Sequence, residues 1–247
     1  MSKRIFITQI LIVLLFLGIW QTLAHFNIIN TFIFSSPFKV FKTIIDLTVN
    51  HNLIYHIFVT IKEIIVSFIL GITIAFFISV FLYLNPFIAK TLEPFLTMLN
   101  SMPKVALGPI IIIWVGANTK AIIFMALLIN VIISILNIYN GFINIDATKK
   151  KIFKVFKSNK KDELLYLVIP ENKNIIVNTM KINISLTMIG VIMGEFLVSK
   201  SGIGYLIVYG TQVFNLDLVI SGIILLLVIS YILYKIVEYI EKILLSL

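Results

Sequence analysis

The feature that most constrains the fold is a series of six long apolar runs. A helix needs about 20 predominantly apolar residues to cross the hydrocarbon core of a bilayer. The runs are Ile5–Ala24, His56–Leu84, Phe87–Val115, Ala121–Ile143, Ile175–Val198 and Leu218–Val237. Apolar residues make up 60% of the chain, whereas soluble domains average about 45–50%. The sequence therefore predicts an all-α polytopic membrane protein with about six transmembrane helices.

The first run is expected to stay in the protein. It is longer than the usual apolar core of a signal peptide, and no small-residue cleavage site follows it. Ser36 and Pro37 then favour the start of an amphipathic helix too short to cross the membrane. We expect three regions: residues 1–53 with the first helix and this external segment, a core at 54–241, and a cytoplasmic tail at 242–247.

The charged residues predict the topology. Lys3 and Arg4 precede the first run and favour a cytoplasmic N-terminus. After four crossings the chain returns to the cytoplasm at residues 144–170, and seven lysines fall between Lys149 and Lys161. Cytoplasmic loops are enriched in lysine and arginine, so the two signals agree. We expect a multi-pass protein of the cell membrane with both termini in the cytoplasm.

The stretch at 144–170 has the pattern of a short amphipathic helix. Its apolar residues, among them Ile152, Phe153 and Phe156, alternate with Lys151, Lys154 and Lys157. Such a helix fits a hydrophobic groove with acidic rims in a partner protein. The other interpretation is a lysine-rich helix lying on anionic lipid.

The sequence carries no motif for bond-making chemistry. It has no phosphate-binding glycine loop, no cysteine and no histidines at ligand spacing. We therefore expect neither an enzyme nor a bound cofactor or metal, and active transport would take its energy from a partner or an ion gradient. The net charge of +9 is explained by loops that face an anionic leaflet, so no nucleic-acid partner is expected.

Two charges within apolar runs are candidate functional groups, because ionised side chains are costly in a bilayer. Glu195 either has a functional role or reaches headgroups or Lys200 at the outer end of its helix. Lys104 stands in the proline-broken third run. It either faces a water-filled cavity or pairs with a carboxylate such as Glu93.

Gly190 and Gly194 are four residues apart in the fifth run. This spacing puts two small residues on one helix face and lets another helix approach closely. Helix packing is the favoured interpretation over a role in substrate binding.

The order of several motifs resembles a known family. Ser101–Ile123 carries Pro103, Ala106, Pro109, Trp114 and Gly116 in that family's order, and Glu195, Gly202 and Gly204 match its E…G-x-G run. The chain is similar to the inner-membrane permease subunits of ABC importers, in the nitrate/sulfonate/taurine branch. The resemblance implies the type-1 permease fold. It also implies a translocation path or gate near Pro103, Lys104, Pro109, Glu195, Gly202 and Gly204.

The stretch at 144–170 corresponds to the docking loop of this family, but its residues depart from the family pattern. The family pattern is E-A-A, three residues, a glycine, and a closing Leu-Pro pair. Here Ile169 and Pro170 match the closing pair, but Lys151, Ile152 and Phe153 occupy the E-A-A positions and Lys157 the glycine. A lysine at a bend that needs positive φ would cost about 1 kcal/mol or more. Either the bend is built differently, or the ATPase has diverged with it, or transport is impaired.

The resemblance implies that the loop docks an ATPase through Lys151, Ile152, Phe153, Phe156, Lys157, Ile169 and Pro170. The implied partners are a cytoplasmic ABC ATPase, an extracytoplasmic solute-binding protein, a second copy of the permease and the lipid bilayer. The implied solute is a sulfonate-, taurine- or nitrate-like anion, or a pyrimidine precursor of thiamine. The alternatives are an ion-coupled secondary transporter using Glu195 or Lys104, and a degenerate permease that serves as a membrane anchor.

Overall fold

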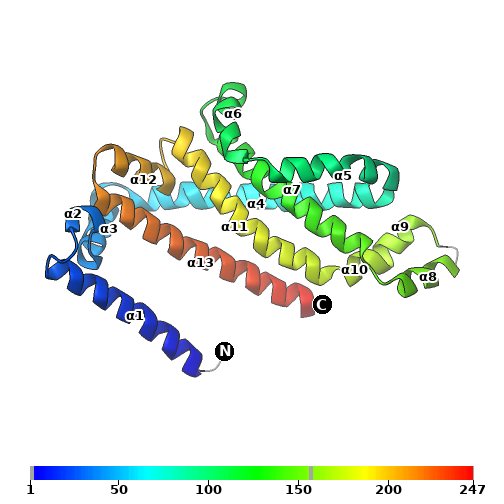
Figure 1. Ribbon diagram of the computed structural model, residues 1–247, viewed down its shortest axis with the longest axis horizontal. Coiled ribbons are helices and arrows are strands. Elements are labelled where there is room, and N and C mark those ends of the chain that lie inside the picture. Colours follow the sequence, from blue (N-terminus) through cyan, green and yellow to red (C-terminus); the bar gives the residue numbers. More distant parts are fainter. Residues whose placement is uncertain (1–2, 156–157, 247) are drawn as a thin grey trace. The chain divides into compact units, whose positions relative to one another are not determined.

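The computed structural model describes residues 3–155 and 158–246, and within these residues the chain is helical with no β-strand. Figure 1 shows the helices in chain order. The chain divides into two compact units. The first combines Met1–Val59 with Lys200–Val228, and the second combines Thr60–Ser199 with Ile229–Leu247.

Five helices are long and apolar enough to cross a membrane. They are α1 (Lys3–His25), α4 (Leu53–Leu84), α7 (Thr119–Ile143), α11 (Lys173–Val198) and α13 (Leu216–Ser246). A bent pair, α5 (Pro86–Ser101) followed by Lys104–Val115, makes a sixth crossing if its two parts, which meet at 87°, form one span, and otherwise it is a re-entrant loop. The prediction of an all-α fold with about six transmembrane helices is confirmed.

Proline explains the break in the third apolar run. Between α5 and the bend, Met102 has an extended conformation (φ −70°, ψ 138°), the one that a following proline favours. A 3₁₀ turn, η1 (Lys104–Leu107), then leads into α6 (Gly108–Val115), where Pro109 lies in the first turn and needs no N–H. Chain that leaves the helical path at membrane depth needs protein or water beside it.

The first unit holds α1, α2 (Thr31–Phe34), α3 (Pro37–Asn50) and α12 (Ile203–Gln212). The α3 helix begins where the sequence predicts, because the Ser36 hydroxyl accepts a hydrogen bond from the Lys39 N–H at 3.2 Å and Pro37 opens the first turn. Leu47 of α3 packs with Leu53, Leu206 and Leu218 in a small core. This core fixes α3 and α12 beside the start of α4.

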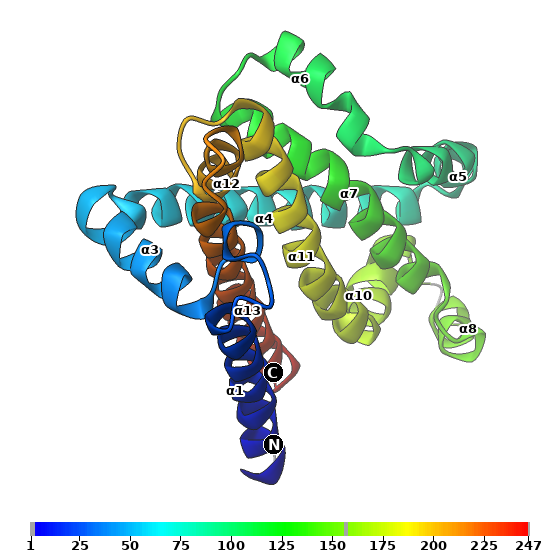
Figure 2. The same cartoon turned by 60° about the vertical axis from the view of Figure 1, so that its left-hand side comes forward.

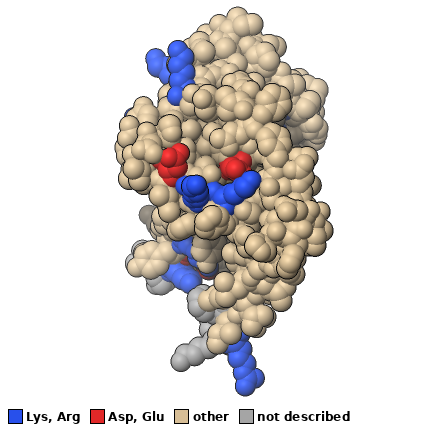
Figure 3. Space-filling view, turned by 90° about the vertical axis from the view of Figure 1, so that its left-hand side faces the viewer, with Lys and Arg blue, Asp and Glu red and all other residues tan. Residues whose placement is uncertain are grey.

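The surface matches a protein surrounded by lipid. The face in Figure 3 carries few charged side chains among many uncharged ones. Along α1, large apolar side chains such as Leu14 and Phe16 are more than half exposed. In water such a surface would be unfavourable, whereas lipid tails are as apolar as leucine.

The second unit is organised around the antiparallel pair α7 and α11, which lie side by side in both ribbon views (Figures 1 and 2). A Cβ added at Gly190 would come within 2.4 Å of the Ala126 Cα, and one at Gly194 within 2.9 Å of the Ile122 Cα. Both glycines therefore lie where α11 approaches the α7 backbone most closely, and a side chain there would push the helices apart.

A chain of buried polar side chains continues this contact. The Asn130 amide donates to the Thr187 hydroxyl at 2.6 Å, and Thr187 donates to Asn183 Oδ1 at 3.1 Å. Asn183 in turn donates to the Ser134 hydroxyl at 2.8 Å. All four side chains are fully buried. A buried polar group is costly unless it is hydrogen-bonded, so these bonds help to select this pairing of α7 and α11.

Candidate functional site

The candidate site is the segment Asn144–Asn172, which joins α7 to α11. It contains α8 (Ala147–Val155), α9 (Lys160–Glu163), a π-helical turn η2 (Leu164–Val168) and α10 (Ile169–Glu171). Here it is called the connecting segment. It includes the lysine-rich stretch that the sequence singles out for docking.

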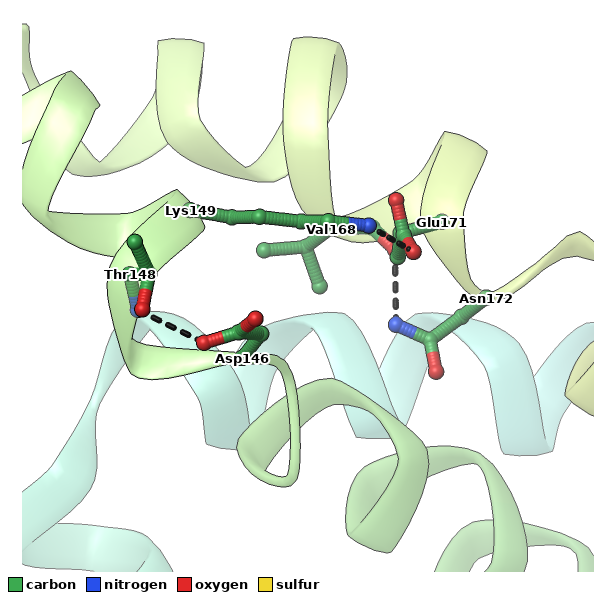
Figure 4. Close-up of polar contacts among 6 residues, drawn as sticks. All are labelled: Asp146, Thr148, Lys149, Val168, Glu171 and Asn172. Atoms are coloured by element: carbon green, nitrogen blue, oxygen red, sulfur yellow. Dashed lines mark hydrogen bonds and ion pairs between the residues drawn. The ribbon is translucent and has the colours of Figure 1, made fainter.

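Local polar contacts define where α8 begins (Figure 4). The Asp146 carboxylate accepts a hydrogen bond from the Thr148 N–H at 2.7 Å. This bond favours the ionised form and lowers the pKa of Asp146 below its ordinary value. The Lys150 ammonium donates to the Ile143 carbonyl at 3.0 Å, at the C-terminal end of α7. A cation is favourable at that end of a helix, so Lys150 ties α8 to α7.

A second set of contacts closes the segment into a loop (Figure 4). Lys149 of α8 forms an ion pair with Glu171 of α10. The Asn172 amide donates to the Val168 carbonyl at 2.8 Å and caps the last turns before α11. The ion pair is about half exposed, so it contributes little free energy and mainly restricts the geometry.

Two side chains shape the reversal between α8 and α9. The Ser158 hydroxyl donates to the Phe153 carbonyl at 2.8 Å, and Asn159 Oδ1 accepts from the Asp162 N–H at 2.8 Å. Phe156 and Lys157 lie outside the described residues, as does the side chain of Ile152. The predicted bend at Lys157 therefore stays a prediction.

The second half of the segment is anchored in the protein. Leu164 and Val168 are buried in a core that also contains Leu82 and Phe142. The Tyr83 hydroxyl donates to the Glu163 carboxylate at 3.1 Å. This anchoring fixes the orientation of η2 relative to the ends of α4 and α7.

Other residues of the segment are exposed, and together we call them the docking surface. They are Lys151, Val155, Lys160, Lys161, Leu165 and Tyr166. The exposed fractions of Val155, Leu165 and Tyr166 are 79%, 57% and 73%. The segment, which is held by caps, an ion pair and a core, thus exposes three large apolar side chains as well as lysines.

Of the residues that the sequence proposes for docking, the structure places Lys151 on this surface, Phe153 partly buried in α8, Ile169 half-buried and Pro170 exposed in α10. Sequence reasoning missed Leu165 and Tyr166. The available signal was the unbroken apolar run Leu164–Val168, because a single helical turn cannot bury five consecutive side chains on one face.

The structure encloses Glu195, which is only 1% exposed. Its carboxylate accepts a hydrogen bond from the Thr60 hydroxyl at 2.7 Å, and it contacts the buried Glu63. It therefore links α11 to α4 and does not reach headgroups. The Lys104 ammonium donates to the Asn100 carbonyl at 2.9 Å, within its own bend, in place of an ion pair with Glu93.

The other proposed gate residues shape the backbone. Pro103 precedes η1 and Pro109 lies in the first turn of α6. Gly202 has φ +107°, a conformation that favours glycine, and its N–H donates to His56 Nδ1 at 3.0 Å. Gly204 is buried in the first turn of α12. None of these groups offers bond-making chemistry.

The comparison with protein families decides the identity. The family described as "Binding-protein-dependent transport system inner membrane component" matches residues 67–245, which include the whole connecting segment. The chain belongs to this family. It is thus a multi-pass inner-membrane permease of an ABC importer and not an enzyme, as the sequence resemblance implies.

Known relatives cover most of this permease. It is 27% identical to a probable ABC transporter permease of Haemophilus influenzae over 93% of both chains. It is 22% identical, over 92% of its own length and 82% of the relative, to a Bacillus subtilis protein whose name assigns it to aliphatic sulfonates transport. A nitrate import permease of Synechococcus elongatus is 24% identical over 82% of this chain and 75% of the relative.

A solved structure has the same fold. The MetNI methionine ABC transporter, in an inward-facing crystal form, contains a chain that matches with a TM-score of 0.68 at 18% identity. The match covers 78% of this permease and 95% of that chain. The expected type-1 ABC permease fold is therefore confirmed.

Proposed function

We propose that this permease docks a cytoplasmic ABC ATPase through its docking surface and carries a small polar solute inward by alternating access. Membership of the importer family implies an ATPase and a solute-binding protein as partners. The single observation that carries the proposal is the exposed Leu165–Tyr166 pair on an anchored, lysine-rich segment.

The proposal rests on how the connecting segment is held. A segment that transmits motion must itself be stiff, and this one is fixed by Asp146, the Lys149–Glu171 pair and the buried Leu164 and Val168. Adsorption to lipid needs lysines but no such rigidity. These contacts favour docking to a protein over adsorption to the membrane.

The chemistry of the surface indicates what the ATPase groove should offer. Tyr166 and Leu165 are large exposed side chains of the kind that fill pockets in a partner, and Lys151, Lys160 and Lys161 are exposed in the same segment. The complementary groove has an apolar floor and acidic rims. Charge at the rim mainly accelerates association, and salt screens that effect.

The proposal extends to features that the family leaves open for this chain. A second copy of the permease would complete the path, and both termini would lie in the cytoplasm, on the side of the lysine-rich segment. Relatives named for aliphatic sulfonates, nitrate and formylaminopyrimidine transport support a small anionic or heterocyclic solute.

The test is an affinity purification of the tagged permease from membranes of its source organism in mild detergent. We expect an ATPase with a phosphate-binding loop to co-purify. Replacing residues 151–161 by a neutral glycine–serine linker of equal length, together with Leu165→Ser and Tyr166→Ser, should abolish its recovery while the permease still elutes as a single folded species. A matched control replaces Lys39 and Lys42 of α3 by glutamine and should keep the ATPase. Full recovery with the linker variant would refute docking through this surface.

A further inference from the structure

A groove rich in asparagine runs between α7 and α11 in the second unit. Its volume is about 330 Å³, and it is lined by Asn137, Asn140, Gly141, Asn144, Ile175, Asn178, Thr179 and Ile182. Here it is called the asparagine groove. Four of its eight lining residues carry an amide side chain, and none carries a charge.

The asparagines share one side of the helix pair. Asn137, Asn140 and Asn144 are three and four residues apart, so they lie along one face of α7. Asn178 lies across the groove on α11, where its side chain is exposed. Gly141 keeps the helices close here, because an added Cβ would lie 2.7 Å from Asn172 Oδ1.

The row of amides extends into the apolar helix α7. Asn137 is six residues before the end of α7, which is about 9 Å along the helix axis, and Asn144 caps that end. An unsatisfied polar group is costly to move from water into an apolar medium. A row of amides on a transmembrane helix is therefore expected to face water or protein and not lipid tails.

Near the same end of the second unit, the exposed side of α4 carries aromatic side chains and not amides. The rings of Tyr83 and Phe142 touch at 5.9 Å, so the ends of α4 and α7 lie together. Near this end the exposed side chains of α4 include Phe77 and Phe81, at 65% and 50% exposure. One helix thus presents aromatic side chains where its neighbour presents amides, as expected if only the first faces lipid.

We infer that the asparagine groove forms part of the wall of the translocation path and binds the polar atoms of the solute through Asn140 and Asn178. This inference rests on the proposed function. An amide both donates and accepts hydrogen bonds and carries no charge. Such a wall suits a small oxygen-bearing solute, whether anionic or neutral, because the lining residues carry no fixed positive charge that would retain an anion.

The natural sequence makes the test direct, because it contains no cysteine. Asn140→Cys and Asn178→Cys each introduce one thiol into the groove, and Phe81→Cys gives a control three residues from its helix end, as Asn140 is. The probe is a charged, water-soluble methanethiosulfonate, applied to inside-out vesicles. A thiol reacts as the thiolate, which needs water, so we expect modification in the groove about tenfold faster than at position 81.

A second measurement asks whether the groove belongs to a path that opens and closes. ATP with vanadate is added to trap the ATPase-bound state. We expect modification at positions 140 and 178 to slow about fivefold or more, because inward closure removes water from the thiols, while position 81 stays unchanged. Groove rates as slow as the control would mean that lipid or a second copy covers the groove, and would overturn the inference. Fast modification at positions 140 and 178 whose rate does not change in the trapped state would also overturn the inference.

Recovery of the ATPase with each variant separates this inference from the proposed function. If the ATPase is absent from all preparations, the docking proposal fails, and the groove is then not a path wall in an ATP-driven cycle. If the ATPase is present and the groove thiols do not respond to trapping, the docking proposal stands and the groove inference alone fails.

Discussion

Polar side chains are buried in the contact between α7 and α11, but they are exposed in the connecting segment that joins these two helices. In the contact, Asn130, Thr187 and Asn183 are buried and hydrogen-bonded to one another. On the docking surface, Lys151 and Tyr166 end in solvent. The first region holds the fold together, and the second is available to a partner.

The difference bears on the predicted loss of the family signature. The resemblance assigns Lys151 to a signature position, and the structure shows its side chain exposed. The groups that hold the segment, such as Asp146, Leu164 and Val168, lie outside the altered positions. A change at the exposed positions therefore alters what docks there more than it alters stability.

The largest expected effect comes from widening the α7–α11 contact. In Gly190→Val the new Cβ would meet the backbone of Ala126, and overpacking of this kind costs about 3 kcal/mol or more when backbone must move. We expect little folded protein by fluorescence-detected size exclusion. Gly18→Val is the control, because nothing lies within 4 Å of that position. Equal yields from the two variants would contradict the close contact.

The next effect concerns the docking surface. Leu165→Ser combined with Tyr166→Ser should weaken ATPase binding about tenfold or more, since exposed anchors of this size are each worth about 1–2 kcal/mol at an interface. The melting temperature of the permease should hardly change. Val49→Ser on α3 removes a side chain with the same 73% exposure as Tyr166 and should leave the affinity intact. Binding is measured by titration of the purified ATPase in detergent.

A smaller effect separates the two kinds of asparagine on α7. Asn130→Leu removes the donor to Thr187 and should cost about 1 kcal/mol, the size of a buried hydrogen bond between membrane helices. Asn137→Leu changes an amide that lines the open groove and should leave thermal stability nearly unchanged. A larger loss of stability for Asn137→Leu than for Asn130→Leu would contradict the assignment of Asn130 to the buried contact and of Asn137 to the open groove.

The smallest effect is pH-dependent and concerns Asp146. Its pKa is lowered by the Thr148 N–H, so the ionised carboxylate stabilises the folded state. This contribution is fully present above the ordinary pKa of about 4 and is lost as the pH falls through the lower native value. The difference in melting temperature between wild type and Asp146→Ala should be constant from about pH 7 to 5 and shrink below about 4. Asp146→Asn keeps an acceptor oxygen but cannot ionise, so its difference from wild type should follow the same pH profile and be smaller at pH 7 than that of Asp146→Ala. A difference from wild type that does not change between pH 7 and pH 3 would contradict the capping role of the ionised carboxylate.

Much of the fold could be predicted from local patterns. The lengths of the apolar runs predicted the transmembrane helices, and the prolines predicted the break after α5. Ser36 and Pro37 predicted the start of α3. Each of these signals depends on residues that are neighbours in the sequence. The order of motifs was enough to indicate the permease family, which the family comparison confirms.

The rest depends on contacts between distant residues. Glu195 is enclosed by Thr60, 135 positions away, so no local pattern distinguishes it from a charge at a membrane boundary. Leu165 and Tyr166 become exposed only because Leu164 and Val168 are buried in a core with Phe142. The asparagine groove likewise requires α7 and α11 to be set side by side.

The most direct test of ATPase docking is a cross-link from position 166. Tyr166→Cys, in this chain without native cysteine, is labelled with a thiol-reactive benzophenone in native membranes and irradiated. We expect a cross-link from position 166 to a protein with a phosphate-binding loop, and no such product from Val49→Cys. A cross-link only to lipid at position 166, or the same ATPase product from both positions, would contradict docking through this surface.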